Sequence, residues 1–196
     1  MLLFFFIKIF HKKLYDVIRY DIYSTYITTD DKVILSAIKR DIEFRILFYF
    51  RVAAYFKEHG LLFGSVIYKF YFNLSTRYCI TLYPETKIGL GFRIGHIGNI
   101  IVHSKSVIGN NVTISQGVTL GKIHTGKKQG TPTLGNNIYI GPNAVIVGNI
   151  KIGNDIIISG NAFVNFDVPD NSVVLGNPGV VHHKEKPTAE ILNCLT

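Results

Sequence analysis

The chain has 196 residues, of which 47% are hydrophobic and only 17% charged, so it can bury enough apolar surface to fold and a disordered protein is excluded. Its two cysteines, Cys79 and Cys194, lack CxxC spacing, which argues against a disulfide scaffold or a thiolate metal site and favours two buried or idle thiols. The net charge of +8 is spread along the chain, which suggests anionic partners but, without a motif, no nucleic acid.

The composition divides the chain at about residue 88. Of the 25 aromatic residues 21 lie before this point, and of the 18 glycines 16 lie after it. Residues 1–10 are apolar but too short to span a bilayer, and they lack the basic start and cleavage site of a signal peptide. We therefore expect a cytoplasmic protein in which two kinds of structure are joined.

Residues 1–80 are predicted to be α-helical. Asp30-Asp31 is a plausible cap for a helix from Lys32 to His59, which Gly60 ends, and a further helix is expected over residues 61–78. We expect the many aromatic side chains to pack helix against helix, against the following domain or against a neighbouring subunit. The alternative is that these aromatic and basic helices, together with residues 2–10, make a peripheral contact with the inner face of a membrane.

The second part of the chain repeats every six residues without slippage over residues 134–168. Neither an α-helix nor a simple strand keeps every sixth residue on one face, but a triangular solenoid with one short strand and one corner per unit does. The expected inward-facing residues are Leu134, Ile140, Ile146, Ile152, Ile158 and Val164, with a second small or aliphatic residue four positions after each. Gly or Asn is expected at the tight corners, where φ is often positive.

The same period runs from Ile88 to Leu120, and the whole pattern breaks twice. The spacing between Ile94 and Val102 is eight residues, and the extra residues follow His96. Residues 121–133 have no inward aliphatic pattern and are predicted to form a loop outside the solenoid. Because regularity alone would serve stability, both breaks point to function.

Several blocks of the repeat resemble the left-handed β-helix hexapeptide transferases, and within them the serine O-acetyltransferase branch. The blocks are Ile88-Gly-Leu-Gly-Phe-Arg-Ile-Gly-His96, Ile114-Ser-Gln-Gly-Val-Thr-Leu-Gly121, Gly148-Asn-Ile-Lys-Ile-Gly153 and Gly176-Asn-Pro-Gly179. In character they are closest to the enzymes that acetylate capsule and surface polysaccharides. The resemblance implies a left-handed β-helix domain over residues 81–182, a C-terminal tail over 183–196, a homotrimer, and acetyl-CoA as cosubstrate with no metal.

The resemblance also assigns site residues. His96 matches the family's catalytic base, since an imidazole that titrates near neutrality can take the proton of an attacking alcohol. Acetyl-CoA is expected to contact the backbone near Gly121, Lys122, Pro142 and Gly160. The side chains of Lys122, Lys127 and Lys128 could meet the phosphates of CoA, or could only solvate the loop.

Four positions depart from the serine acetyltransferase pattern. Thr131 stands where the family has its second histidine, and Gly130 stands where it has the basic residue before that histidine. Gly95 stands in place of the acid before the catalytic histidine, and Thr81 in place of the aspartate that orients it. These departures weaken L-serine as the acceptor. They leave open which group orients His96, for which Glu85 is a candidate by its nearness in the sequence.

The leading hypothesis is therefore an acetyl-CoA-dependent O-acetyltransferase that acts on a sugar hydroxyl of a surface polysaccharide or its precursor. The first alternative is an L-serine O-acetyltransferase of cysteine biosynthesis, and the second is a non-catalytic trimeric solenoid that binds a partner. A metal-dependent hydratase is disfavoured because His96, His103 and His124 lack the short spacing of a metal site.

Overall fold

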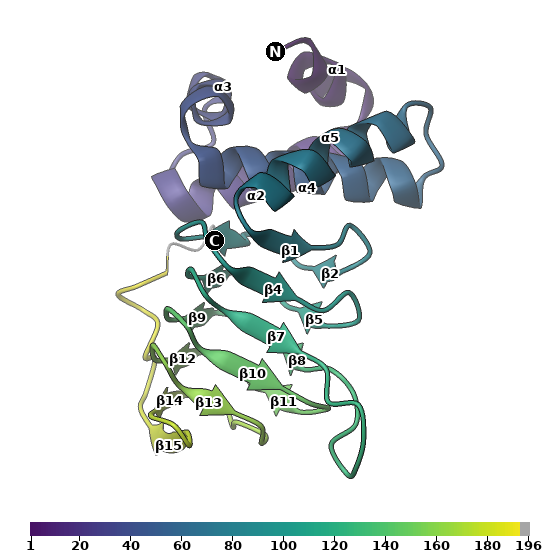
Figure 1. Cartoon of the computed structure of the whole chain (residues 1–196). Coiled ribbons are helices and arrows are strands. Elements are labelled where there is room, and N and C mark those ends of the chain that lie inside the picture. The colour runs from purple at the N-terminus through teal and green to yellow at the C-terminus, as the bar shows by residue number, and fades with distance from the viewer. Residues whose placement is uncertain (193–196) are drawn as a thin grey trace.

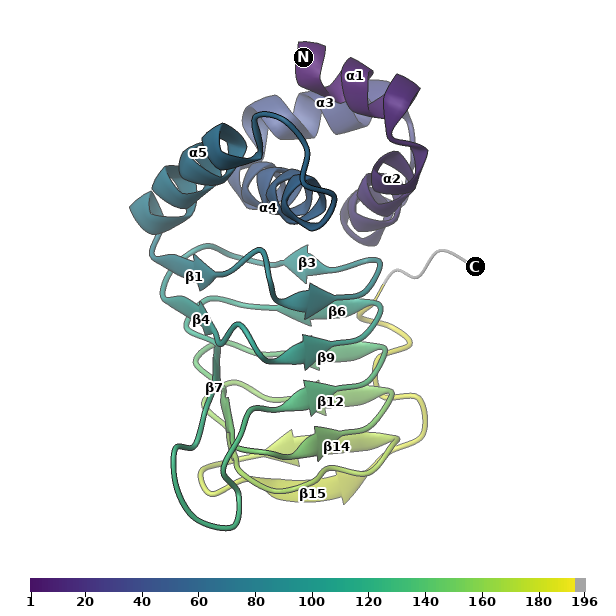
Figure 2. The same ribbon diagram turned by 90° about the vertical axis from the view of Figure 1, so that its right-hand side faces the viewer.

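The computed structural model describes residues 1–192, which form a cap of helices on one end of a parallel β-helix (Figures 1 and 2). The cap consists of α1 (Leu2–Phe10), α2 (Lys12–Tyr26), α3 (Asp31–Arg40), α4 (Ile42–Glu58) and α5 (Gly64–Arg77). None of these helices combines the length and the apolar character that crossing a membrane requires.

Three sheets make up the sides of the β-helix, and the chain visits them in turn. Sheet A contains β1 (Ile80–Leu82), β4 (Ile100–Val102), β7 (Thr119–Gly121), β10 (Val145–Val147) and β13 (Phe163–Val164). Sheet B contains β2 (Lys87–Ile88), β5 (Val107–Ile108), β8 (Thr133–Leu134) and β11 (Lys151–Ile152). Sheet C contains β3 (Arg93–Ile94), β6 (Val112–Ile114), β9 (Ile138–Ile140), β12 (Ile156–Ile158), β14 (Ser172–Leu175) and β15 (Val180–His183).

The six-residue period predicted from the sequence sets the register of this β-helix. Leu134 on β8 pairs with Ile108 of the coil before and with Ile152 of the coil after. All six predicted inward residues between 134 and 164 are buried, as are the residues four positions after each. Only β15 departs from the parallel order, because it pairs antiparallel with β14 and closes the far end of the prism.

The corners are turned by asparagine more than by glycine. Positive φ angles recur at six corner asparagines, namely Asn99, Asn111, Asn137, Asn143, Asn161 and Asn171, and also at glycines such as Gly91, Gly117 and Gly148. The glycines that directly follow inward residues have another reason, since a Cβ on Gly135 would lie 2.5 Å from the carbonyl oxygen of Gly153. These glycines let successive coils stack closely. The expectation of Gly or Asn at corners with positive φ is confirmed.

The helical cap differs from the prediction at one boundary. Asp30 caps α3 as expected, because its side chain accepts a hydrogen bond from the backbone N–H of Lys32 at 2.8 Å. The predicted single helix from Lys32 to His59 is wrong, however, since the chain breaks between α3 and α4. At the break Asp41 accepts from the backbone N–H of Phe44 at 2.9 Å and so caps a second helix.

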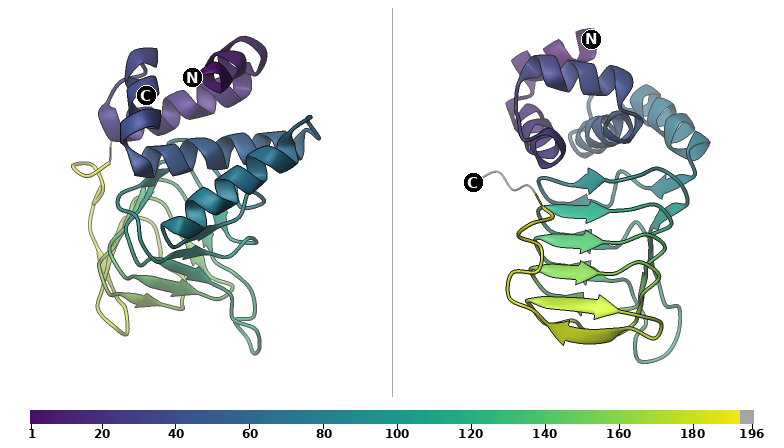
Figure 3. Two further views of the ribbon diagram at one scale, coloured as in Figure 1. Left: turned by 45° about the horizontal axis from the view of Figure 1, so that its top comes forward. Right: turned by 90° about the vertical axis from the view of Figure 1, so that its left-hand side faces the viewer.

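Helix α4 lies between two hydrophobic cores. One face, with Ile46 and Phe50, packs on the top of the β-helix, and the opposite face, with Phe44 and Val52, packs among α1, α2 and α3. Figure 3 shows α4 lying across the end of the prism with the other helices around it. Because both faces are buried, α4 joins the cap and the prism into one packed body.

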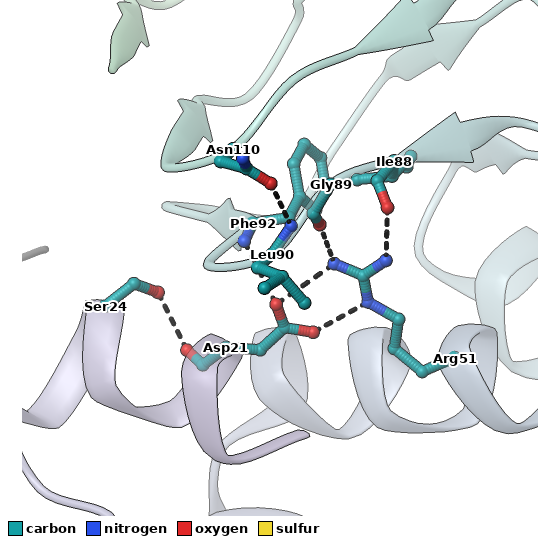
Figure 4. Close-up of polar contacts among 8 residues, drawn as sticks. All are labelled: Asp21, Ser24, Arg51, Ile88, Gly89, Leu90, Phe92 and Asn110. Carbon is teal, nitrogen blue, oxygen red and sulfur yellow. Dashed lines mark hydrogen bonds and ion pairs between the residues drawn. The ribbon is translucent and has the colours of Figure 1, made fainter. Parts of the chain in front are cut away.

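A buried ion pair joins α2 and α4 to the first coil (Figure 4). Arg51 donates to both carboxylate oxygens of Asp21, from Nε at 2.7 Å and from Nη2 at 3.0 Å. The same guanidinium donates to the carbonyl oxygens of Ile88, at 2.8 Å, and Gly89, at 2.5 Å, while Asp21 also accepts from the backbone N–H of Phe92 at 3.0 Å. The ion pair thus holds the turn of residues 88–92 beneath the helices.

The two cysteines have separate outcomes. Cys79 is a free, exposed thiol in the turn before β1, so it is not a buried thiol. Cys194 lies outside the described residues.

Candidate active site

His96 lies at the corner where the chain passes from sheet C to sheet A in the first coil, and its side chain is exposed. The register break predicted here is real. Residues 97–99 widen the corner, and Gly98 accepts a hydrogen bond at 2.8 Å from the backbone N–H of Gly117 in the next coil. At this wider corner His96 projects from the wall of the prism, and its imidazole is accessible to a substrate.

Two of the predicted acetyl-CoA contacts stack on the same corner as His96. Between successive coils, Asn143 donates from its backbone N–H to Gln116 at 3.0 Å, and Asn161 donates to Pro142 at 2.8 Å. Pro142 and Gly160 therefore lie on the His96 corner, in the third and fourth coils. We call this line of residues the C–A corner.

The C–A corner offers narrow access to the backbone. A Cβ on Gly160 would lie 3.2 Å from the carbonyl oxygen of Pro142, so a larger residue there would stand over the corner. Among the described residues, the backbone N–H of Gly160 takes part in no hydrogen bond, and neither does that of Lys122 on the opposite edge of sheet A. Free amides beside small residues suit a long, amide-containing arm such as pantetheine, which hydrogen-bonds to backbone.

The remaining predicted contacts lie on the opposite edge of sheet A, where the chain leaves for sheet B. Gly121 ends β7, Lys122 follows it, and the predicted loop of residues 121–133 leaves the prism here and runs down beside the lower coils (Figures 1 and 2). Lys128 fixes the loop, because its Nζ donates to the carbonyl oxygen of Asn165 and its carbonyl accepts from Asn149 at 3.0 Å. Lys127 is exposed on the same loop.

Sequence reasoning missed a cluster of basic groups on this edge. His103 follows β4 and donates from its backbone N–H to Leu120 at 2.9 Å, which places it beside Gly121. Burial lowers the pKa of His103, and the nearby charges of Lys122, Lys105 and His124 lower it further. The six-residue register could have revealed this cluster, because His103 and Gly121 occupy the same position after an inward residue in successive coils.

One chain therefore divides the predicted site between two edges of sheet A. A strand of three residues separates the edges, which is about 10 Å at 3.3 Å per residue. His96, Pro142 and Gly160 occupy one edge, while the loop lysines occupy the other. The residues predicted to contact acetyl-CoA therefore do not lie together within a single chain.

The positions that depart from the family pattern carry no ionisable side chain to face His96. Thr81, on β1, lines a cavity of about 160 Å³ between sheet A and α5, whose lining includes four aromatic side chains, Tyr68, Tyr71, Phe72 and Tyr83, together with Ser75, Thr76, Ile80, Leu82 and Pro84. Glu85 does not orient His96, because it lies at the corner between sheets A and B and forms an ion pair with Lys57. In residues 1–192 no three His, Cys, Asp or Glu side chains are arranged to hold a metal ion.

Comparison with known proteins identifies the architecture. A serine acetyltransferase solved in complex with CoA superposes with a TM-score of 0.71 at 25% identity, over 88% of this chain and 71% of that one. The chain has the serine acetyltransferase fold. The Neisseria gonorrhoeae serine acetyltransferase solved with serine gives a TM-score of 0.69 at 26% identity, over 88% of this chain and 70% of that one.

Similarity in sequence points to the same group. Serine acetyltransferase 5 of Arabidopsis thaliana is 44% identical over 125 residues, which are 62% of this chain and 39% of that protein. The serine acetyltransferase of Staphylococcus aureus strain N315 is 42% identical over 102 residues, 51% of this chain and 47% of that protein. The chain thus spans less than half the length of these relatives, and no protein-family model matches it.

These relatives confirm the predicted hexapeptide-repeat left-handed β-helix and the resemblance to the serine acetyltransferase branch. The expected closer kinship with polysaccharide acetyltransferases finds no support in them.

Proposed function

We propose that the chain is an acetyl-CoA-dependent O-acetyltransferase in which His96 is the general base. The observation that carries the proposal is the C–A corner, where an exposed histidine at a register break stands in line with Pro142 and the free amide of Gly160. The similarity to serine acetyltransferases, one of them solved with CoA, supports the same assignment.

In this reaction His96 accepts the proton of an acceptor hydroxyl as the hydroxyl oxygen attacks the carbonyl carbon of the acetyl thioester. A carbon–oxygen bond forms, the carbon–sulfur bond breaks, and the proton passes to the departing CoA sulfur. Backbone N–H groups at the corner would stabilise the negative charge on the thioester oxygen. The exposure of His96 lets it meet both substrates at once.

We further propose that the complete site forms between two chains of a homotrimer. The two edges of sheet A do not converge in one chain, but a neighbour that packs its loop against the C–A corner would bring Lys122 and Lys127 to the CoA phosphates. A test is to mix two inactive variants, His96→Ala and Lys122→Glu. Recovery of activity on mixing supports a shared site. No recovery, in a protein whose measured mass is three times 22.0 kDa, contradicts it.

L-Serine is the acceptor that the relatives support, since those compared here are serine acetyltransferases. A sugar hydroxyl is a second candidate, favoured by a specific observation. Thr81, Gly95, Gly130 and Thr131 offer no charge to hold the ammonium and carboxylate of an amino acid. The aromatic cavity beside Thr81 suits an uncharged ring instead.

The experiment measures CoA release from acetyl-CoA with L-serine and with a panel of free and nucleotide-linked sugars. His96→Ala is expected to lower turnover by about 10² or more, while the matched control His182→Ala, an exposed histidine on β15, leaves it unchanged. Release with serine selects the amino acid, and release with a sugar selects the glycan. If wild type neither releases CoA nor binds acetyl-CoA by calorimetry, the chain is a non-catalytic solenoid.

A further inference from the structure

Helix α1 leaves most of its apolar side chains in water. It has nine residues, of which Lys8 is the single polar one, and only Phe4 and Ile7 are buried. Leu2 is 89% exposed and Ile9 is 71% exposed. Phe5, Phe6 and Phe10 are exposed as well, so the whole face of α1 opposite its buried side is apolar.

The turn between α4 and α5 presents a second apolar group. Leu62 is 82% exposed and Phe63 is 74% exposed, and Val66 continues the group along α5. Phe63 has a φ of 66°, a left-handed conformation that a bulky residue rarely adopts, so packing holds the backbone while its ring stays in solvent. Clusters of exposed apolar side chains such as these two mark interaction surfaces.

The two groups belong to one end of the molecule. His11, directly after α1, lies with its ring 5.3 Å from the ring of Tyr55 and 5.7 Å from that of Phe56, both in the last turns of α4. Figures 1 and 3 show α1 on the side of the cap that faces away from the β-helix. We call α1 and residues 61–66 together the apolar end.

The charge around the apolar end is mainly positive. Residues 1–15 include Lys8, Lys12 and Lys13 and no acid, and residues 59–84 include Lys69 and Arg77 and no acid. Lys8 is paired with Asp31. Lys12 and Lys13 are exposed and form no ion pair among the described residues, although Lys13 also lines the cavity between α4 and the first coil. Exposed aromatic rings bordered by lysines are complementary to a layer of apolar chains beneath anionic headgroups.

We propose that the apolar end docks the protein onto the surface of an anionic lipid bilayer. The segment lies on the bilayer and does not cross it, because nine helical residues span about 14 Å and the hydrocarbon core is about 30 Å thick. A second copy of the chain fits this surface less well, since a symmetric contact would bring two copies of the same basic surface together.

Docking would also orient the proposed active site. His96 lies in the first coil of the β-helix, which is the coil next to the cap. If the proposed acetyl transfer is correct, a lipid-linked acceptor would reach His96 from the same surface. The docking itself does not depend on the acetyl transfer, so the two are tested separately.

The experiment is cosedimentation of the full chain with phosphatidylcholine vesicles, with and without phosphatidylglycerol. We expect tight binding only to the anionic vesicles. Phe5→Ser with Phe10→Ser, and separately Lys12→Glu with Lys13→Glu, should each weaken binding by about tenfold or more. Ile101→Ser, which changes an exposed apolar residue of the β-helix, is the matched control and should bind as wild type does.

Absence of binding to anionic vesicles overturns the proposal, as does equal binding by the phenylalanine variant. It is also overturned if wild type forms a larger assembly that the phenylalanine variant dissociates while neither binds lipid, because a second copy then covers the apolar end. CoA release with a soluble acceptor, measured on the same samples, reports on the acetyltransferase proposal independently.

Discussion

Replacing Arg51 with methionine should destabilise the whole fold, because Arg51 is where the cap meets the β-helix. The variant loses four hydrogen bonds, two to Asp21 and one each to the carbonyls of Ile88 and Gly89. Asp21, which is 1% exposed, then keeps only backbone donors of the first coil, such as the N–H of Phe92. Removing one partner of such a buried pair costs about 3–5 kcal/mol.

For a chain of this length 1 kcal/mol corresponds to about 2–4 °C, so the melting temperature should fall by roughly 6–20 °C. The assay is urea and thermal unfolding at one protein concentration, which keeps any effect of subunit association constant. Arg40→Met is the matched control, since Arg40 is exposed and makes no hydrogen bond or ion pair among the described residues, and should change stability by less than about 0.5 kcal/mol.

The loss should also depend on pH. Burial raises the pKa of Asp21 above its ordinary value, and the Arg51 charge and the Phe92 N–H oppose this rise. Without Arg51 the folded-state pKa rises further. Below the unfolded-state pKa the carboxyl is protonated in both states and the penalty is small, and the penalty grows as pH rises toward neutrality. A loss of less than about 1 kcal/mol at pH 7, or one that grows toward acid pH, would refute the reasoning.

Substitutions at four positions test the β-helix, each by its urea midpoint. Ile140→Ala, fully buried, should cost about 2–5 kcal/mol, whereas Ile101→Ala on the exposed face should cost less than about 1 kcal/mol, and equal losses would contradict the assigned inward face. Gly109→Ala should cost about 1–3 kcal/mol because its Cβ would lie 2.2 Å from the carbonyl oxygen of Gly135, so a neutral result would disprove the close stacking of coils. Asn161, with a φ of 60°, should tolerate Gly but lose about 1 kcal/mol as Ala, and the reverse order would rule out a left-handed corner.

The β-helix could be predicted in detail because its restraint is local and repeated. One inward aliphatic residue every six positions leaves a single register, and Leu134 and Ile152 pair as that register requires. The cap could be predicted only as helical. Helix α4 is apolar on nearly all sides because it serves two cores, so its periodicity did not reveal that it begins at Ile42 and not at Lys32.

The buried ion pair could not be predicted from the sequence for a related reason. Asp21 and Arg51 lie on separate helices, and charged residues in helices are usually exposed. Their burial depends on how α2 and α4 cross above the turn of residues 88–92, which is a tertiary arrangement. A pairing over 30 residues leaves no local pattern to read.

The candidate site could be predicted as a set of residues but not as a place. The family resemblance assigns His96, which lies at a break in the repeat, and the six-residue register puts Pro142 and Gly160 on its corner. The loop lysines obey the same register, yet they fall on the other edge of sheet A. The two edges of sheet A, which are three residues apart, do not converge within one chain. The catalytic proposal therefore requires a neighbouring chain, and a monomer that turns over acetyl-CoA at the full rate would contradict both the shared site and the assignment of the loop to CoA.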